Sequence, residues 1–308
     1  MVTLKDLSTE EPRAPGHRLC AGCGPAIVSR MVMKALRGPT VLTNATGCLE
    51  VATTIYPFTS WRIPWVHVAF ENAAAVASGI EAAYKAMARR GSWDEKVDVI
   101  AFGGDGGTFD IGIQALSGAL ERRHDFVYIC YDNEAYMNTG IQRSGATPRG
   151  ASTTTSPAGR KIPGKIEWKK NLAAICAAHG IDYVATASPA FMLDYISKVR
   201  KAIEVDGPAV IHVISPCPLG WRSEPADTMK IARLAVQTAY FPICEIEKGK
   251  YRLNVKVPKP LPVEEFLKTQ GRFSHLFQPE FRAEIDAIQQ HVNEEWSSLL
   301  QLCGEAKA

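Results

Sequence analysis

The sequence predicts an α/β fold, in which a doubly wound and mostly parallel sheet carries helices on both faces and is followed by a C-terminal extension. Apolar runs of strand length alternate with helical patterns along most of the chain. Several of these runs end in turns of Gly, Pro or Asn, where a connection would leave the sheet. The length of 308 residues and the hydrophobic fraction of 46% are enough for one large domain or two ordinary ones.

Composition excludes several classes of function. The net charge is +3 and no Lys/Arg cluster is interleaved with aromatic residues, so nucleic acid is not an expected partner. No apolar run approaches the roughly 18 to 20 residues that span a bilayer, so no membrane is expected either. The polar, acidic N-terminus is unlike a signal peptide, which predicts a cytoplasmic protein. The eight cysteines of the chain are then not expected to form a disulfide framework.

The first part of the chain is expected to hold one extended segment, two strands and two helices. In order these are an arm at 1–16, a helix at 26–36, a strand at 41–44, a strand at 66–69 and an alanine-rich helix at 73–88. Pro25 suits the first position of a helix, where its missing N–H costs nothing, and Gly38 and Pro39 end that helix. The small residues of 73–88 allow close packing, which indicates a buried or subunit-facing helix.

A glycine-rich turn lies at the centre of the chain. The apolar run 97–102 leads into Gly103–Gly107, a helical pattern follows to about residue 120, and the apolar run 126–131 ends at Asp132 and Asn133. This order predicts a strand, a turn, a helix, a second strand and a polar loop.

The rest of the chain continues the alternation and then changes character. The expected elements are a polar loop at 143–165, a helix at 168–179, a strand at 183–186, a helix at 189–203, a strand at 209–214, a helix at 228–240, a hairpin at 244–255 and a helix at 279–302. We expect an N-terminal arm at 1–16, a cofactor-binding domain at 17–225 and a C-terminal extension at 226–308 that makes subunit contacts.

The central turn has the residues of a metal–diphosphate site. Glycines let backbone N–H groups approach phosphate oxygens, and the start of the following helix favours negative charge. Asp105 and Asn133 each follow a strand, and their oxygens could join phosphate oxygens around Mg²⁺. If the sheet is parallel, both lie at its carboxyl edge, where ligands bind. The GDG sequence followed by Asn133, 28 residues after Asp105, resembles the thiamine diphosphate motif. That resemblance adds the backbone carbonyl of Ala135 as a third Mg²⁺ ligand.

Four of the cysteines also lie where they could meet at this edge. Cys20 and Cys23 form a C-x-x-C pair at a helix start, a position that favours thiolates. Cys48 and Cys217 each follow a strand at a Gly or Pro turn. Four thiolates suit an Fe–S cluster and suit a structural zinc ion equally well, so spacing alone leaves both open. The other cysteines, at 130, 176, 244 and 303, are expected to be buried or incidental.

Longer segments resemble the β subunit of a 2-oxoacid:ferredoxin oxidoreductase of the pyruvate synthase type. They are CAGCGP at 20–25, TGC at 46–48, HVAFENAAAVASGIEAA at 67–83, GDGGTFDIGIQALSGALER at 104–122, YDNEAYMNTGIQRSGATP at 131–148 and HVISPCPLGWR at 212–222. The resemblance implies the thiamine-diphosphate-binding (PP-type) domain of that family, spanning residues 17–225.

The resemblance also implies the roles of individual residues. Cys20, Cys23, Cys48 and Cys217 would ligate one 4Fe–4S cluster near thiamine diphosphate. The Mg²⁺–diphosphate would be held by Gly104, Asp105, Gly106, Gly107, Asn133 and Ala135, and Gly47 would be a further cofactor-binding residue. Asn138 would reach the reacting end of the cofactor as the catalytic residue, and Thr139 and Ile141 would line that pocket. The reaction would be oxidative decarboxylation of a 2-oxoacid, with electrons passing singly through the cluster to ferredoxin.

Partners are implied in the same way. The α (pyrimidine-domain) subunit would supply the carboxylate that contacts the aminopyrimidine, so neither Glu50 nor Glu71 is given that role. Ferredoxin-like γ and δ subunits would complete the enzyme. Pyruvate is the most expected substrate, and oxalate or another 2-oxoacid is an alternative. Two rival functions are a non-redox thiamine diphosphate enzyme subunit with a Cys₄ zinc site and an electron-transfer subunit that has lost thiamine.

Overall fold

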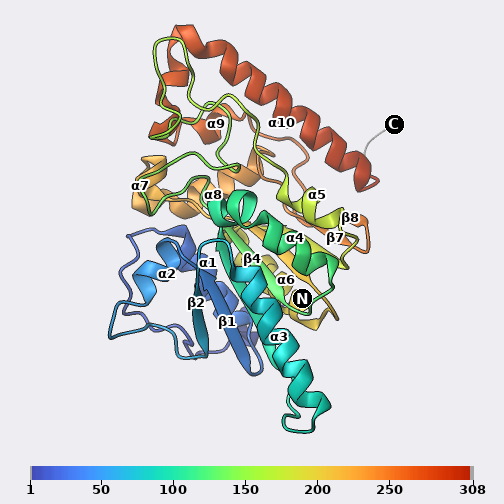
Figure 1. Ribbon diagram of the computed structural model, residues 1–308. Helices are drawn as coiled ribbons and strands as arrows, with labels where there is room; N and C mark the ends of the chain where they lie inside the picture. Colours follow the sequence, from blue (N-terminus) through green and yellow to red (C-terminus); the bar gives the residue numbers. More distant parts are fainter. Residues whose placement is uncertain (1, 306–308) are drawn as a thin grey trace.

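The computed structural model describes residues 2–305, and its centre is one eight-stranded sheet with helices on both faces (Figure 1). The strands are β1 (Thr40–Ala45), β2 (Trp65–Val68), β3 (Asp98–Gly104), β4 (Val127–Asp132), β5 (Tyr183–Ala187), β6 (Ala209–Ile214), β7 (Cys244–Glu247) and β8 (Lys250–Leu253). The helices are α1 (Gly24–Ala35), α2 (Cys48–Thr53), α3 (Ala73–Arg89), α4 (Ile113–Glu121), α5 (Leu172–Ala177), α6 (Met192–Glu204), α7 (Pro218–Trp221), α8 (Thr228–Gln237), α9 (Glu264–Leu267) and α10 (Arg282–Leu302). Short 3₁₀ turns are η1 (Leu4–Asp6), η3 (Pro189–Phe191), η4 (Pro225–Asp227), η5 (Gly271–Phe277) and η6 (Pro279–Phe281).

The strand order is β2-β1-β3-β4-β6-β5-β7-β8, with β1 to β6 parallel and β7 and β8 antiparallel. The chain passes from β1 outward to β2, and then returns to place β3 on the other side of β1. The switch in direction therefore falls between β1 and β3, and in open α/β sheets ligands bind at the carboxyl ends of the strands at such a point. The doubly wound, mostly parallel fold class is confirmed.

Alternate residues of each central strand face opposite layers. In β3, Ile100 and Phe102 pack with α1 and α6, whereas Val99 and Ala101 pack with α3, α4 and α5. Strands that are buried on both faces have continuous apolar sequences, because both faces exclude water. These two layers hold the strand ends in fixed register, which positions the loops that leave the carboxyl edge.

The C-terminal segment is joined to the main sheet. β7 pairs antiparallel with β5, so the hairpin expected at 244–255 extends the sheet that the N-terminal part begins. A third apolar cluster, which includes Trp221, Phe266 and Phe273, packs α8, α9 and α10 beside the carboxyl edge. In Figure 1 the long helix α10 lies across this end of the molecule, away from α3. A sheet therefore crosses the boundary that we expected at residue 225.

Several elements differ from the sequence-based expectations. Cys48 opens a helix, α2, where only a turn was expected, and the chain after the glycine turn is π-helical over Gly106–Ile111 (η2) before α4 begins. Helix α5 begins at Leu172, four residues later than expected, because Asn171 caps it by accepting a hydrogen bond from the Ala174 N–H at 3.0 Å. Within residues 2–305, no helix combines the length and apolar character needed to cross a membrane.

Candidate active site at the carboxyl edge of the sheet

Four neighbouring strands bring the predicted site residues to one edge. β1 is followed by Gly47 and Cys48, β3 by Asp105 and β4 by Asn133. β6 is followed by the loop that carries Cys217. The C-x-x-C loop reaches the same edge through a hydrogen bond of 3.0 Å from the Gly24 N–H to the carbonyl of Pro216. Parallel pairing explains the convergence, because all these strands end at the same side.

Gly24 is a residue whose role the sequence did not reveal. A Cβ at this position would lie 2.6 Å from the carbonyl oxygen of Pro216 and 2.7 Å from the Ser215 hydroxyl. Only glycine therefore lets the C-x-x-C loop pack directly on the loop that carries Cys217. Glycine is required at position 106 for a similar reason, since a side chain there would collide with the ring of Tyr136.

Asp105 is buried at the end of β3, with 1% of its surface exposed. Its Oδ2 accepts a hydrogen bond of 2.5 Å from the Ser144 hydroxyl. Burial, followed by the charge of Asp132, raises the pKa of Asp105 well above its ordinary value. A carboxylate in this position is costly unless a cation balances it.

The side-chain amide of Asn133 faces two oxygen atoms. One of its terminal atoms lies 2.8 Å from the carbonyl oxygen of Ala135 and 2.9 Å from Oδ1 of Asp105. With the amide nitrogen there, Asn133 donates hydrogen bonds to both; with the oxygen there, three oxygens converge. Neighbouring ligands of an octahedral Mg²⁺ at 2.0–2.1 Å are separated by about 2.9 Å. The donor set and its spacing therefore fit Mg²⁺.

The four candidate cysteines are neighbours, and all cysteines of the described chain are free thiols. Burial and, to a smaller extent, the charges of the other cysteines of the group raise the pKa of Cys23 and of Cys48 to about 12. The expectation that the helix start favours a thiolate was therefore wrong for Cys23, because burial outweighs the helix terminus. Thiols of this kind lose their protons when a metal binds them.

The number of cysteines bears on what they could hold. Among residues 2–305, no three His, Cys, Asp or Glu side chains lie close enough together for a single metal ion. Zinc takes four sulfur atoms at about 2.3 Å from one ion. A 4Fe–4S cluster also takes four cysteines, each bound to a different iron. Four cysteines therefore suit either group in number.

Three further predicted residues lie on the turn after β4. Tyr136 and Gln142 pair as an antiparallel bridge, and Asn138 and Thr139 are exposed at the tip between them. The Thr139 hydroxyl donates a hydrogen bond of 2.5 Å to the Gln142 side chain, and Ile141 has a positive φ of 65°. The turn is therefore held in a defined shape, with its tip open to another molecule.

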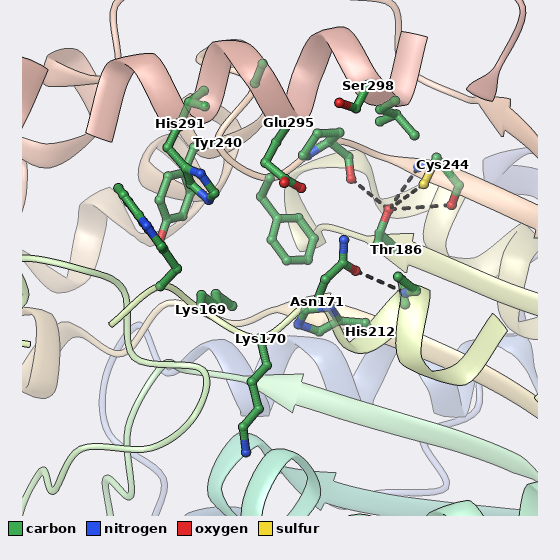
Figure 2. Close-up of a pocket in the computed structure, with 18 of the residues that line it drawn as sticks. Lys169, Lys170, Asn171, Thr186, His212, Tyr240, Cys244, His291, Glu295 and Ser298 are labelled. Atoms are coloured by element: carbon green, nitrogen blue, oxygen red, sulfur yellow. Dashed lines mark hydrogen bonds between the residues drawn. The ribbon is translucent and has the colours of Figure 1, made fainter. Parts of the chain in front are cut away.

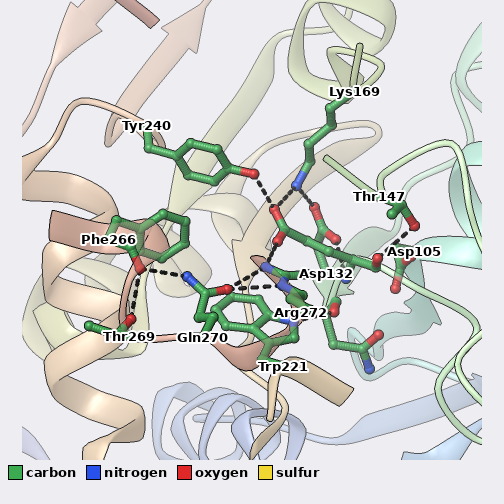
Figure 3. A network of polar contacts seen from close by, with 12 residues as sticks. Asp105, Asp132, Thr147, Lys169, Trp221, Tyr240, Phe266, Thr269, Gln270 and Arg272 are labelled. Carbon is green, nitrogen blue, oxygen red and sulfur yellow. Dashed lines mark hydrogen bonds and ion pairs between the residues drawn. The ribbon is translucent and has the colours of Figure 1, made fainter. Parts of the chain in front are cut away.

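Sequence reasoning missed a buried ionic network directly behind this loop (Figure 3). Glu134, which is fully buried, pairs with Lys169 at 2.8 Å and with Arg272 at 2.5 Å, and accepts a hydrogen bond of 3.0 Å from the Tyr240 hydroxyl. Lys169 also pairs with Asp132 at 2.5 Å. The only signal in the sequence was charged residues beside the predicted metal ligands.

Asp132 is the second carboxylate of the network. Burial alone would raise its pKa, but Lys169 and then the hydrogen-bonded ring of His212, at 2.7 Å, outweigh burial and lower the pKa to about 2. Asp132 Oδ1 accepts a hydrogen bond of 2.9 Å from the N–H of Glu134. The network therefore fixes the backbone on both sides of Asn133.

A separate cavity of about 260 Å³ lies between α10, α5 and the β5–β7 edge, and it contains none of the predicted site residues (Figure 2). His212, Lys169 and Tyr240 line it, so it touches the back of the network. The candidate ligands lie at the carboxyl edge of the sheet and not in this cavity.

Comparison with known proteins agrees with this geometry. Residues 45–213 match the family described as thiamine pyrophosphate enzyme, C-terminal TPP binding domain. The chain is 58% identical to the pyruvate synthase subunit PorB of Methanocaldococcus jannaschii, over 92% of this chain and 95% of that protein. The chain belongs to the PorB family of thiamine pyrophosphate enzymes. This confirms the family that the motifs of the sequence indicated.

Other PorB-family relatives extend over almost the whole chain. PorB of Thermotoga maritima is 49% identical over 98% of this chain and 96% of its own length. The ketoisovalerate oxidoreductase subunit VorB of Pyrococcus furiosus is 48% identical over 95% and 94%. A solved 2-oxoglutarate:ferredoxin oxidoreductase from Magnetococcus marinus, with a TM-score of 0.54 at 24% identity over 74% of this chain and 79% of that one, shares the fold.

Proposed function

We propose that this PorB-family chain is the β subunit of a thiamine-diphosphate-dependent 2-oxoacid:ferredoxin oxidoreductase, with pyruvate as the first substrate to test. The observation that carries the proposal is the meeting of two donor sets at one edge of the sheet. Oxygens of Asp105, Asn133 and Ala135 gather at 2.8–2.9 Å spacing, and four cysteines gather beside them.

The oxygen set would hold Mg²⁺ and, through it, the diphosphate. Asp105 and Asn133 would contribute side-chain oxygens and Ala135 its carbonyl. Gly47, Gly104, Gly106 and Gly107 would leave room for the cofactor beside the backbone. Thiamine diphosphate, when bound, supplies a ring that accepts the electron pair left when a 2-oxoacid loses CO₂. Ser144, which donates to Asp105, would keep that carboxylate in place.

The turn at 136–142 would close over the reacting end of the cofactor. Asn138 would contact the reacting atoms, with Thr139 and Ile141 as the wall of the pocket. Since Asn138 and Thr139 are exposed at the tip of the turn, another chain is needed to exclude water from them. The α subunit, which would also bring the carboxylate for the aminopyrimidine, is the proposed partner. The lone chain should therefore show no turnover.

Cys20, Cys23, Cys48 and Cys217 would ligate a 4Fe–4S cluster, which supplies a one-electron acceptor. From there electrons would pass to the ferredoxin-like γ and δ subunits and to ferredoxin. Free cysteines throughout the described chain suit a reducing compartment and support the proposed cytoplasmic location. The rival function with zinc is less favoured, because the relatives of this chain are named as subunits of pyruvate synthase and ketoisovalerate oxidoreductase.

The test is EPR spectroscopy of the anaerobically purified complex after dithionite reduction, combined with iron, zinc and thiamine diphosphate analysis. A 4Fe–4S signal that also appears when pyruvate replaces dithionite would support the proposal. A zinc-containing, EPR-silent protein would contradict it. Because a ketoisovalerate enzyme subunit is as similar as some pyruvate synthase subunits, pyruvate, 3-methyl-2-oxobutanoate and oxalate should be compared as reductants of ferredoxin in the same preparation.

A further inference from the structure

Arg13 belongs to the N-terminal arm, yet it is buried, with 6% of its surface exposed. The backbone on either side of it is fixed. The Ala14 N–H donates to the Ser60 carbonyl at 2.7 Å, and the Arg62 N–H donates to the Pro12 carbonyl at 2.8 Å. This pairing places the Arg13 side chain inside the protein and leaves it little freedom to move to solvent.

The guanidinium lies against the first turn of α1. Its Nη2 donates a hydrogen bond of 2.8 Å to the carbonyl of Ala26. Cys23, three residues earlier, is the N-cap of the same helix, and its sulfur is an electrostatic neighbour of Arg13. The C-x-x-C loop and Arg13 therefore share one end of α1.

Two nitrogens of this guanidinium, Nε and Nη1, are buried without a hydrogen-bond partner. Glu11 does not neutralise the group fully, because its carboxylate already pairs with Arg30 at 2.6 Å and with Lys34 at 2.9 Å. A buried charge with unsatisfied donors is costly unless an anion lies nearby. Close to Arg13, the described residues that can become anionic on binding a metal group are the cysteines.

Ser215 is a second buried group of this kind. Its hydroxyl has no partner, and it lies beside Gly24, between the two cysteine loops. Two unrelated orphan donors thus border the four-cysteine site. Hydrogen bonds and nearby charge are among the factors that set the reduction potential of Fe–S clusters.

We propose that Arg13 is a positioning residue for the four-cysteine site, whose fixed positive charge stabilises the reduced state of a cluster bound there and so raises its reduction potential. The inference rests on the proposed cluster site. On reduction one electron enters, given up by the 2-oxoacid as it is oxidised in turnover or by dithionite in vitro, and the negative charge of the site increases by one without a change in covalent bonds. Arg13 lowers the free energy of that extra charge.

The test is a redox titration, followed by EPR, of the anaerobic holoenzyme complex containing wild-type or variant chain. Arg13→Met should favour the oxidised state by about tenfold, a shift of about 59 mV to lower potential for one electron. Arg13→Lys, which keeps the charge, should stay within about twofold of wild type. Arg30→Met is the matched control. It removes a charge from α1, the helix that Arg13 contacts, but from an exposed and paired side chain.

Arg13→Gln gives a second neutral variant that keeps a donor for Ala26, in case the Met variant does not fold. If neutral variants have the wild-type potential, or if Arg30→Met shifts it equally, the role of Arg13 is refuted while the cluster stands. If wild type shows no cluster signal, the proposed function itself fails.

Discussion

The indole Nε1 of Trp221 donates a hydrogen bond of 2.8 Å to the backbone carbonyl of Asn133. Trp221 ends the short helix that begins after Cys217, and its ring lies 4.1 Å from the guanidinium carbon of Arg272, which pairs with Glu134. One side chain therefore links the loop of the candidate cluster to the loop of the candidate metal ligands. The two proposed cofactor sites share a structural support.

Trp221→Phe should weaken binding of thiamine diphosphate and Mg²⁺ by roughly tenfold, because a buried carbonyl that loses its donor costs about 1–3 kcal/mol and Asn133 would shift. Isothermal titration calorimetry on the holoenzyme complex measures this. Trp296→Phe, on the outer helix α10, is the matched control. Unchanged affinity in Trp221→Phe would show that the hydrogen bond does not position Asn133.

Asp105→Ala should abolish binding of thiamine diphosphate but leave the cluster signal intact, since the carboxylate belongs to the oxygen set alone. Cofactor content after gel filtration and EPR of the same sample give both readouts. Asp98→Ala, at the opposite end of β3, is the control and should retain the cofactor. Full cofactor retention in the Asp105 variant would refute the diphosphate assignment.

Cys217→Ser should lower the iron content and remove the 4Fe–4S signal, because a 4Fe–4S cluster of this type uses all four thiolates. Cys303→Ser, near the end of the C-terminal helix, should keep both. Iron analysis and EPR of anaerobic preparations decide the outcome. An equal loss of iron in the two variants would indicate general damage to the fold and would count against the four-cysteine assignment.

Glu134→Gln should destabilise the chain by roughly 3–5 kcal/mol, since Arg272 would remain buried without a carboxylate partner and Lys169 would keep only Asp132. Chemical denaturation of the chain measures the loss. Glu284→Gln breaks the more exposed ion pair with Arg149 and should cost less than about 1 kcal/mol. Similar costs for the two variants would mean that the buried network contributes little to stability.

Glu245 predicts a pH dependence of stability. Burial of Glu245 would raise its pKa, but hydrogen bonds from Tyr183 and Asn254, both 2.6 Å, outweigh burial and lower the pKa to about 2 from 4.5. The folded pKa is depressed, so this carboxylate stabilises the fold above pH 4.5, and that contribution is lost as pH falls towards 2.

The stabilisation amounts to roughly 3 kcal/mol at most. Denaturation of wild type and Glu245→Gln between pH 7 and 2.5 should show a difference in unfolding free energy that is constant above pH 5 and shrinks below pH 4.5. Glu247→Gln, on the same strand but more exposed, is the control. If the difference in unfolding free energy did not change with pH, the Glu245 carboxylate could not be its origin.

Much of the fold could be predicted from the sequence, because buried parallel strands appear there as continuous apolar runs. The runs at 97–102 and 126–131 became β3 and β4, and the residues that follow them, Asp105 and Asn133, were predicted to meet because parallel strands end together. Helix α2 was missed, since six residues carry too little periodicity. The thiolate prediction failed for Cys23 because its burial depends on what packs over the loop.

The amino-acid sequence was sufficient to predict the fold class, the motif of the metal–diphosphate site and the four candidate cysteines, because these depend on residue types at short spacing or at strand ends. The distant residues that support them could be identified only in the folded chain. Arg272 pairs with Glu134 across 138 positions, and Arg13 in the N-terminal arm bonds to the first turn of α1, next to the cysteine loop. Such contacts leave no local pattern, since ion pairing and burial are set by chain segments that meet only after folding.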